Sequence, residues 1–97
     1  MAIRGRIMEA AMDDQRLSGY RILDCHAHIG PYGVFDIPYN DPKGMIPVMD
    51  RAGIERACIS AIAAMISDYR YGNDLVAEAV KEYPERFLGY AVLDPNH

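Results

Sequence analysis

Three stretches of the chain are rich in apolar residues and are predicted to be strands, and the second and third of them are nearly continuous apolar runs. The three stretches are Arg21–Ile29, Arg56–Ile62 and Phe87–Leu93. The second and third stretches lack the alternation of a strand with one solvated face, which favours strands buried on both faces of a parallel sheet. The centres of the three stretches lie 34 and then 32 residues apart. This spacing is typical of consecutive strand–helix units.

Helical patterns fill the intervals between these strands. Apolar residues repeat at helical spacing over Gly44–Ala52, where Pro47 is compatible with a helix only in the first turn. Gly53 follows at a position that favours a left-handed C-terminal cap. A second helix is predicted to begin after a cap at Asn73 and to stop before Pro84.

The order strand, helix, strand, helix, strand predicts an α/β fold with a three-stranded parallel sheet in residues 21–97. Residues 1–20 form a separate N-terminal segment with a helical spacing of apolar residues, namely Ile7, Met8, Ala11 and Met12. Eight strand–helix units of this length would need roughly 260 residues, close to the ~250 of a (β/α)₈ barrel. The chain is therefore either a compact open sheet or the opening part of such a barrel.

Composition narrows the class of protein. The 97 residues are 51% hydrophobic and 25% charged, which excludes a disordered chain, and the net charge of −4 argues against a nucleic-acid surface. The longest apolar run, Ala57–Ile66, is too short to cross a bilayer. The two cysteines, Cys25 and Cys58, do not make a disulfide framework. We therefore expect a soluble cytoplasmic protein with reduced thiols.

The first predicted strand carries the most informative chemistry, in the run from Asp24 to His28 that reads Asp-Cys-His-Ala-His. Side chains alternate along a strand, so we expect Asp24, His26 and His28 on one face and Cys25 on the other. The two histidine Cβ atoms would lie roughly 7 Å apart, which lets both rings reach one ion. The strand ends at Gly30, which places the pair at the carboxyl end of the sheet, where parallel sheets carry their sites.

This pattern leaves two interpretations open. His26 and His28 either bind a divalent metal ion or hydrogen-bond to neighbouring carbonyl groups. Two histidines are too few for a catalytic zinc, which needs three protein ligands and an open position. The third histidine, His97, is expected to be a solvated chain end. A nucleophile formed by Cys25 and a histidine is not expected, because the two would face opposite ways.

Several segments resemble a known family. The run Arg21–Gly30 looks like the first strand of the amidohydrolase superfamily, with its HxH metal motif. More narrowly, it resembles the amidohydrolase-related branch that includes aminocarboxymuconate-semialdehyde decarboxylase. Met49–Cys58 and Tyr83–Pro95 are similar to the helix-to-strand segments that follow in this family. The resemblance covers Arg21–Pro95, which is most of the chain.

The resemblance implies a metal-dependent hydrolase with a TIM barrel, in which His26 and His28 hold a divalent ion, commonly zinc. It also implies a histidine ligand from strand five and an aspartate from strand eight, which this chain does not contain. We therefore expect residues 21–97 to be the N-terminal part of a barrel, inactive on its own. Asp24 matches an acidic residue that touches the metal in some decarboxylases of the branch, and is either a ligand or a support for one. No catalytic residue is assigned.

The reaction itself stays open between two forms. Water attack on an amide, ester or lactone carbon of a small molecule is expected of a hydrolase, and decarboxylation is the alternative within the same branch. The loop Pro31–Gly44 would overhang the metal, and its aromatic residues would either contact the substrate or pack within the loop. These residues are Tyr32, Phe35 and Tyr39.

A non-enzymatic role is a separate alternative. A three-stranded parallel sheet has two unpaired edges, so a barrel fragment is expected to associate with itself or with the remainder of a barrel. A complete small open-sheet domain that binds a ligand without catalysis is the third interpretation. Neither nucleic acid nor a membrane is expected as a partner.

Overall fold

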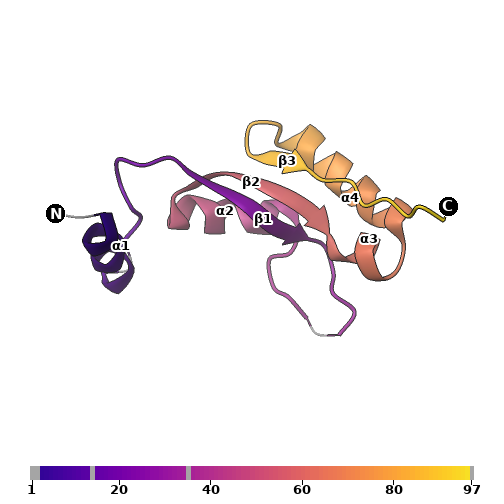
Figure 1. The fold of residues 1–97 in the computed structure, drawn as a ribbon, viewed down its shortest axis with the longest axis horizontal. Helices are drawn as coiled ribbons and strands as arrows, with labels where there is room; N and C mark the ends of the chain where they lie inside the picture. The colour runs from indigo at the N-terminus through magenta and orange to yellow at the C-terminus, as the bar shows by residue number, and fades with distance from the viewer. Residues whose placement is uncertain (1–2, 14, 35, 97) are drawn as a thin grey trace.

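The computed structural model describes residues 3–13, 15–34 and 36–96 of the chain. Its elements in chain order are α1 (Ile3–Met12), β1 (Ile22–Ile29), α2 (Pro42–Ala52), β2 (Ile54–Ala61), α3 (Ile62–Ile66), α4 (Tyr69–Glu82) and β3 (Phe87–Gly89). The three strands form one parallel sheet in the order β1-β2-β3, which confirms the predicted α/β fold (Figure 1).

The hydrophobic core lies on one face of this sheet, beneath α2, α3 and α4. Each strand contributes to it, together with Met49 of α2 and Val76 of α4. Ile59 in β2 and Phe87 in β3 are 0% exposed. The core is completed by Ile29, Ala57, Ala61, Ala64 and Ala79. We call this the covered face.

The opposite face of the sheet is called the open face here. On β2 it carries the residues that alternate with the buried alanines and isoleucine, so Cys58 and Ser60 lie on it. Leu88 pairs with Cys58 and therefore points the same way. Leu88 is 48% exposed, in contrast to its buried neighbour Phe87. The described elements thus leave apolar and polar side chains of this face in contact with solvent.

Helix α2 begins earlier than its apolar pattern predicts. The Asp41 carboxylate accepts a hydrogen bond from the Gly44 backbone N–H at 2.8 Å, and Pro42 takes the first helical position. Pro47 consequently lies beyond the first turn, inside the helix, which corrects the expected start. Gly53 ends the helix with φ 78°, so the predicted left-handed cap is confirmed.

Helix α4 also begins before its predicted cap. The Asp68 carboxylate caps it by accepting from the backbone N–H groups of Arg70 at 3.0 Å and Tyr71 at 3.1 Å. The prediction of Asn73 as the cap is therefore wrong. Asn73 instead holds the C-terminal segment, because its side-chain amide pairs with both the N–H and the carbonyl of Val92, at 2.9 Å each.

The two ends of the chain contain β3 and α1. Strand β3 ends at Gly89, short of the predicted Leu93, although β2 continues to Ala61 before it turns into the unpredicted helix α3. Helix α1 is the helix predicted in the N-terminal segment and stands apart from the sheet (Figure 1). Its residues Ile7, Met8 and Met12 are exposed. Within the described residues, no helix combines the length and apolarity needed to span a membrane.

Candidate metal centre

His26 and His28 bring their rings together near the carboxyl end of β1. The ring centroids lie 5.0 Å apart and the ring planes meet at 83°. Both side chains are exposed. An ion held 2.0–2.1 Å from one nitrogen of each ring would set the centroids roughly 5 Å apart. The centroid separation is compatible with two imidazoles on one ion, and the near-perpendicular ring planes equally describe an edge-to-face contact between the rings.

A second contact fixes the orientation of one ring. Nδ1 of His28 and Oγ of Ser60 are joined by a hydrogen bond of 3.1 Å between β1 and β2. When Nδ1–H donates to the hydroxyl oxygen, Nε2 keeps the lone pair that a metal ion requires. Ser60 was not singled out from the sequence. Its only signal there was its position as the polar residue within an apolar strand.

The irregularity of β1 decides which other residues share a face with the two histidines. Asp24 pairs with Ala57 and Ala27 pairs with Ile59, so β1 has one more residue than β2 between these pairs. Such a bulge reverses the alternation of side chains along a strand. Cys25 and His26 both lie opposite Cys58, and both are exposed. We conclude that both side chains belong to the open face.

The bulge corrects the expected placement of two residues. Asp24, opposite Ala57, lies on the covered face and is half-buried, not beside the histidines. Its Oδ1 accepts a hydrogen bond from the backbone N–H of His26 at 3.0 Å, which supports the bulge. Cys25 lies on the open face instead of pointing away from the imidazoles. Strict alternation predicted the opposite because the extra residue leaves no mark in the hydrophobic pattern.

Tyr90 completes the polar cluster on the open face. Its backbone N–H donates to the Ile59 carbonyl at 2.8 Å, which extends the sheet pairing by one bond beyond β3. A hydrogen bond between its hydroxyl and the Cys58 sulfur raises the pKa of Tyr90, and nearby Cys25 adds to this effect. Residues of β1, of β2 and of the segment that follows β3 therefore meet around the bulge of β1.

A backbone hydrogen bond joins the two ends of the loop that follows β1. The Gly30 N–H donates to the Asn40 carbonyl at 2.8 Å, and Tyr32 lines a cavity of about 370 Å³ formed by loop residues. Tyr39, by contrast, is 70% exposed and adopts φ 59°. Of the two tyrosines predicted to contact a substrate, Tyr32 therefore lines a cavity and Tyr39 extends into solvent. Phe35 and His97 lie outside the described residues.

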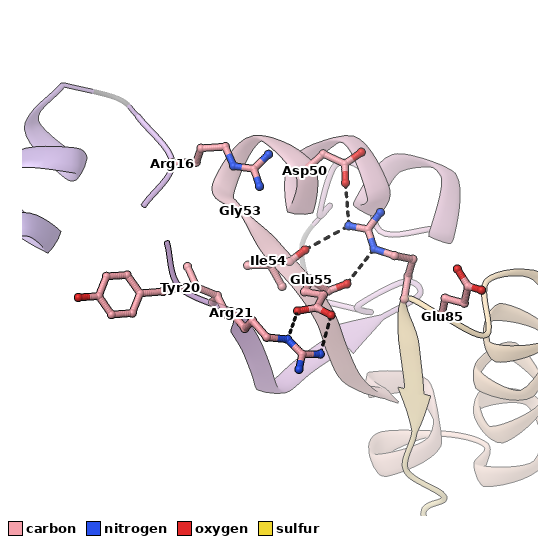
Figure 2. Close-up of a pocket in the computed structure, with 10 residues that line it drawn as sticks. Arg16, Tyr20, Arg21, Asp50, Gly53, Ile54, Glu55 and Glu85 are labelled. Atoms are coloured by element: carbon pink, nitrogen blue, oxygen red, sulfur yellow. Dashed lines mark hydrogen bonds and ion pairs between the residues drawn. The ribbon is translucent and has the colours of Figure 1, made fainter. Parts of the chain in front are cut away.

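A larger cavity of about 600 Å³ opens at the amino ends of the strands, at the opposite end of β1 from His28 (Figure 2). The Arg86 guanidinium donates to the carbonyls of Glu55 at 2.8 Å and Ile54 at 3.1 Å, and lies 2.7 Å from the Asp50 carboxylate. These contacts tie the end of α2 and the start of β2 to β3. We interpret them as structural, since chemistry in parallel sheets lies at the carboxyl ends.

The same amino-terminal cavity contains an exposed ion pair. Arg21 and Glu55 form two parallel hydrogen bonds of 2.8 Å that join β1 to β2 (Figure 2). The hydrogen bond from Arg21 lowers the pKa of Glu55, and the same contact raises the pKa of Arg21. Both side chains are largely solvated, so this pair contributes modestly to stability.

No third ligand joins the histidine pair within residues 3–13, 15–34 and 36–96, where no group of three His, Cys, Asp or Glu side chains could hold an ion. Comparisons with protein-family models, curated proteins and solved structures found no match for this chain. The case for a metal centre therefore depends on the geometry of the two imidazoles and on the resemblance of their motif.

Proposed function

We propose that this chain carries the first two metal ligands of a hydrolase of the amidohydrolase-related type, which acts by water attack on an amide, ester or lactone carbon of a small molecule. The observation that supports the proposal best is the convergence of His26 and His28 on one face at the carboxyl end of β1. Imidazole pairs at such an edge are typical ligands of catalytic zinc.

The roles of the individual residues follow from their contacts. His26 and His28 would hold a divalent ion, with zinc as the natural choice, and Ser60 would position His28. When bound, such an ion lowers the pKa of a water molecule toward 7 and polarises a carbonyl oxygen. The open face around the bulge would be the floor of the substrate site, and the loop carrying Tyr32 would border it.

The remaining ligands are proposed to come from outside the described residues, on further strands of a barrel. Strands β1 and β3 are the outer strands of the sheet and have no partner on their outer edges among the described elements. Both edges and the open face would be covered in a closed barrel. We therefore propose that these 97 residues alone bind the ion without catalysing turnover.

Metal binding tests this proposal directly. The reduced chain would be titrated with Zn²⁺ by calorimetry and with Co²⁺ by visible absorption. His26→Ala and His28→Ala should each weaken binding at least tenfold, and Ser60→Ala should weaken it 10- to 100-fold while keeping both ligands. His97→Ala is the control of the same residue type and should leave the affinity unchanged. Equal affinities in all four variants would refute the metal centre.

The partner proposal has its own test. Because the outer edges of β1 and β3 are unpaired among the described elements, we propose that the isolated chain associates with itself. Multi-angle light scattering on the purified chain should give a mass above the 10.9 kDa of one copy. A single species of that mass, unfolding cooperatively, would contradict self-association and would favour a complete small domain.

A further inference from the structure

Two cysteines from neighbouring strands meet on the open face. The extra residue of β1 places Cys25 opposite Cys58 of β2, and both thiols are free. Adjacent strands lie about 4.8 Å apart, which falls within the roughly 4.4–6.8 Å between Cα atoms that a disulfide bridges. A regular β1 would have put Cys25 on the covered face, so the bulge creates this pair.

The two thiols differ in their access to solvent. Cys25 is exposed, whereas Cys58 is half-buried in the central strand. The Cys58 sulfur is also engaged by the Tyr90 hydroxyl. An exposed thiol next to a shielded one is the arrangement in which one sulfur reacts first with an oxidant and the other resolves the product.

We propose that Cys25 and Cys58 form a thiol–disulfide exchange site for small-molecule disulfides such as oxidised glutathione. The Cys25 sulfur attacks one glutathione sulfur, the glutathione S–S bond breaks, and one reduced glutathione leaves with the Cys25 proton. The Cys58 sulfur then attacks the Cys25 sulfur and expels the second glutathione, which takes the Cys58 proton. The two cysteine sulfurs lose two electrons, which reduce the glutathione disulfide.

The product would tie β1 to β2 at the bulge that carries His26. Exposed disulfides are the ones that cellular thiols reduce readily, so this bond is suited to reversible formation. The inference stands on the strand register and on the exposure of the thiols. It holds whether or not the histidines bind a metal ion, and its failure would leave the proposed function untouched.

Mass spectrometry of the intact chain tests the exchange. The reduced chain would be incubated with oxidised glutathione and quenched with acid. The main product should be a monomer that has lost two hydrogens and retains no glutathione. Cys58→Ser should stop at the first step and retain one glutathione on Cys25. Cys25→Ser should react at least tenfold more slowly, because only the shielded sulfur remains.

The rate of the second step and the nature of the final product give two further tests of the exchange site. Tyr90→Phe, which keeps the ring but removes the hydroxyl, should speed the resolving step, measured as faster loss of the glutathione adduct. Retention of glutathione by the unsubstituted chain to the same extent as by Cys58→Ser would overturn the proposal. Disulfide-linked dimers on a non-reducing gel, in place of the internal bond, would overturn it as well.

Discussion

The adjacent residues Phe87 and Leu88 offer a direct test of which face of the sheet is buried. Phe87 is 0% exposed and packs edge-on against Tyr83, with ring centroids 6.1 Å apart, while Leu88 is 48% exposed on the open face. Phe87→Ala should cost about 3–5 kcal/mol, because it leaves a cavity in the core. A chain of this size is stable by about 5–15 kcal/mol, so this substitution removes a large share of the total.

The neighbouring substitution should cost much less. About half of the Leu88 side chain is already in water, so Leu88→Ala should cost less than about 1.5 kcal/mol. Urea unfolding followed by far-UV circular dichroism gives both free energies, and Phe87→Leu is the milder variant should Phe87→Ala fail to fold. A cost for Leu88→Ala equal to that of Phe87→Ala would refute the assignment of faces, or show that the open face is covered in solution.

Three other substitutions test separate features. Gly72→Ala should destabilise the chain by about 1–3 kcal/mol in thermal unfolding, since a Cβ there would clash with Ala64 of α3. Asn73→Ala should cost about 1–3 kcal/mol and speed amide exchange at Val92, whose two backbone groups lose their partner; unchanged exchange would contradict this. Arg21 holds the pKa of Glu55 below its ordinary 4.5, so the pair stabilises the fold above that pH and is lost on acidification. Glu55→Gln should therefore flatten the fall in melting temperature between about pH 6 and pH 3, and an unchanged slope would argue against the pair.

The sequence predicted the sheet better than it predicted the helix ends. Nearly continuous apolar runs located β2 and β3, and the apolar positions within residues 21–29 located β1, because burial in a sheet selects such residues directly. The spacing of the three strands predicted their parallel order. Helix starts were displaced by several residues, since Asp41 and Asp68 took the cap positions. Asn73 is an equally good cap by composition, and only the tertiary contact with Val92 explains its use elsewhere.

The candidate metal site was also predicted only in part. The pairing of His26 with His28 was predicted because residues two apart in a strand lie on one face, and the rings do meet. Asp24 and Cys25 each lie on the face of the sheet that was predicted for the other. The reason is that a bulge depends on the alignment of two strands and has no sequence pattern of its own. The contact with Ser60 could not be predicted either, because it depends on the register of β2 against β1.

The extra residue in β1 also bears on how this strand tolerates length changes. Removal of Cys25 would leave Leu23 opposite Arg56, Asp24 opposite Ala57 and Ala27 opposite Ile59, so β1 would alternate regularly from Leu23 to Ile29. The separate irregularity between Ile22 and Leu23 would remain. A three-nucleotide deletion would therefore remove the Cys25 thiol and keep both histidine side chains, and the reverse insertion would restore the thiol. Position 25 is therefore the place where this surface gains or loses its exposed thiol while β1 stays paired with β2.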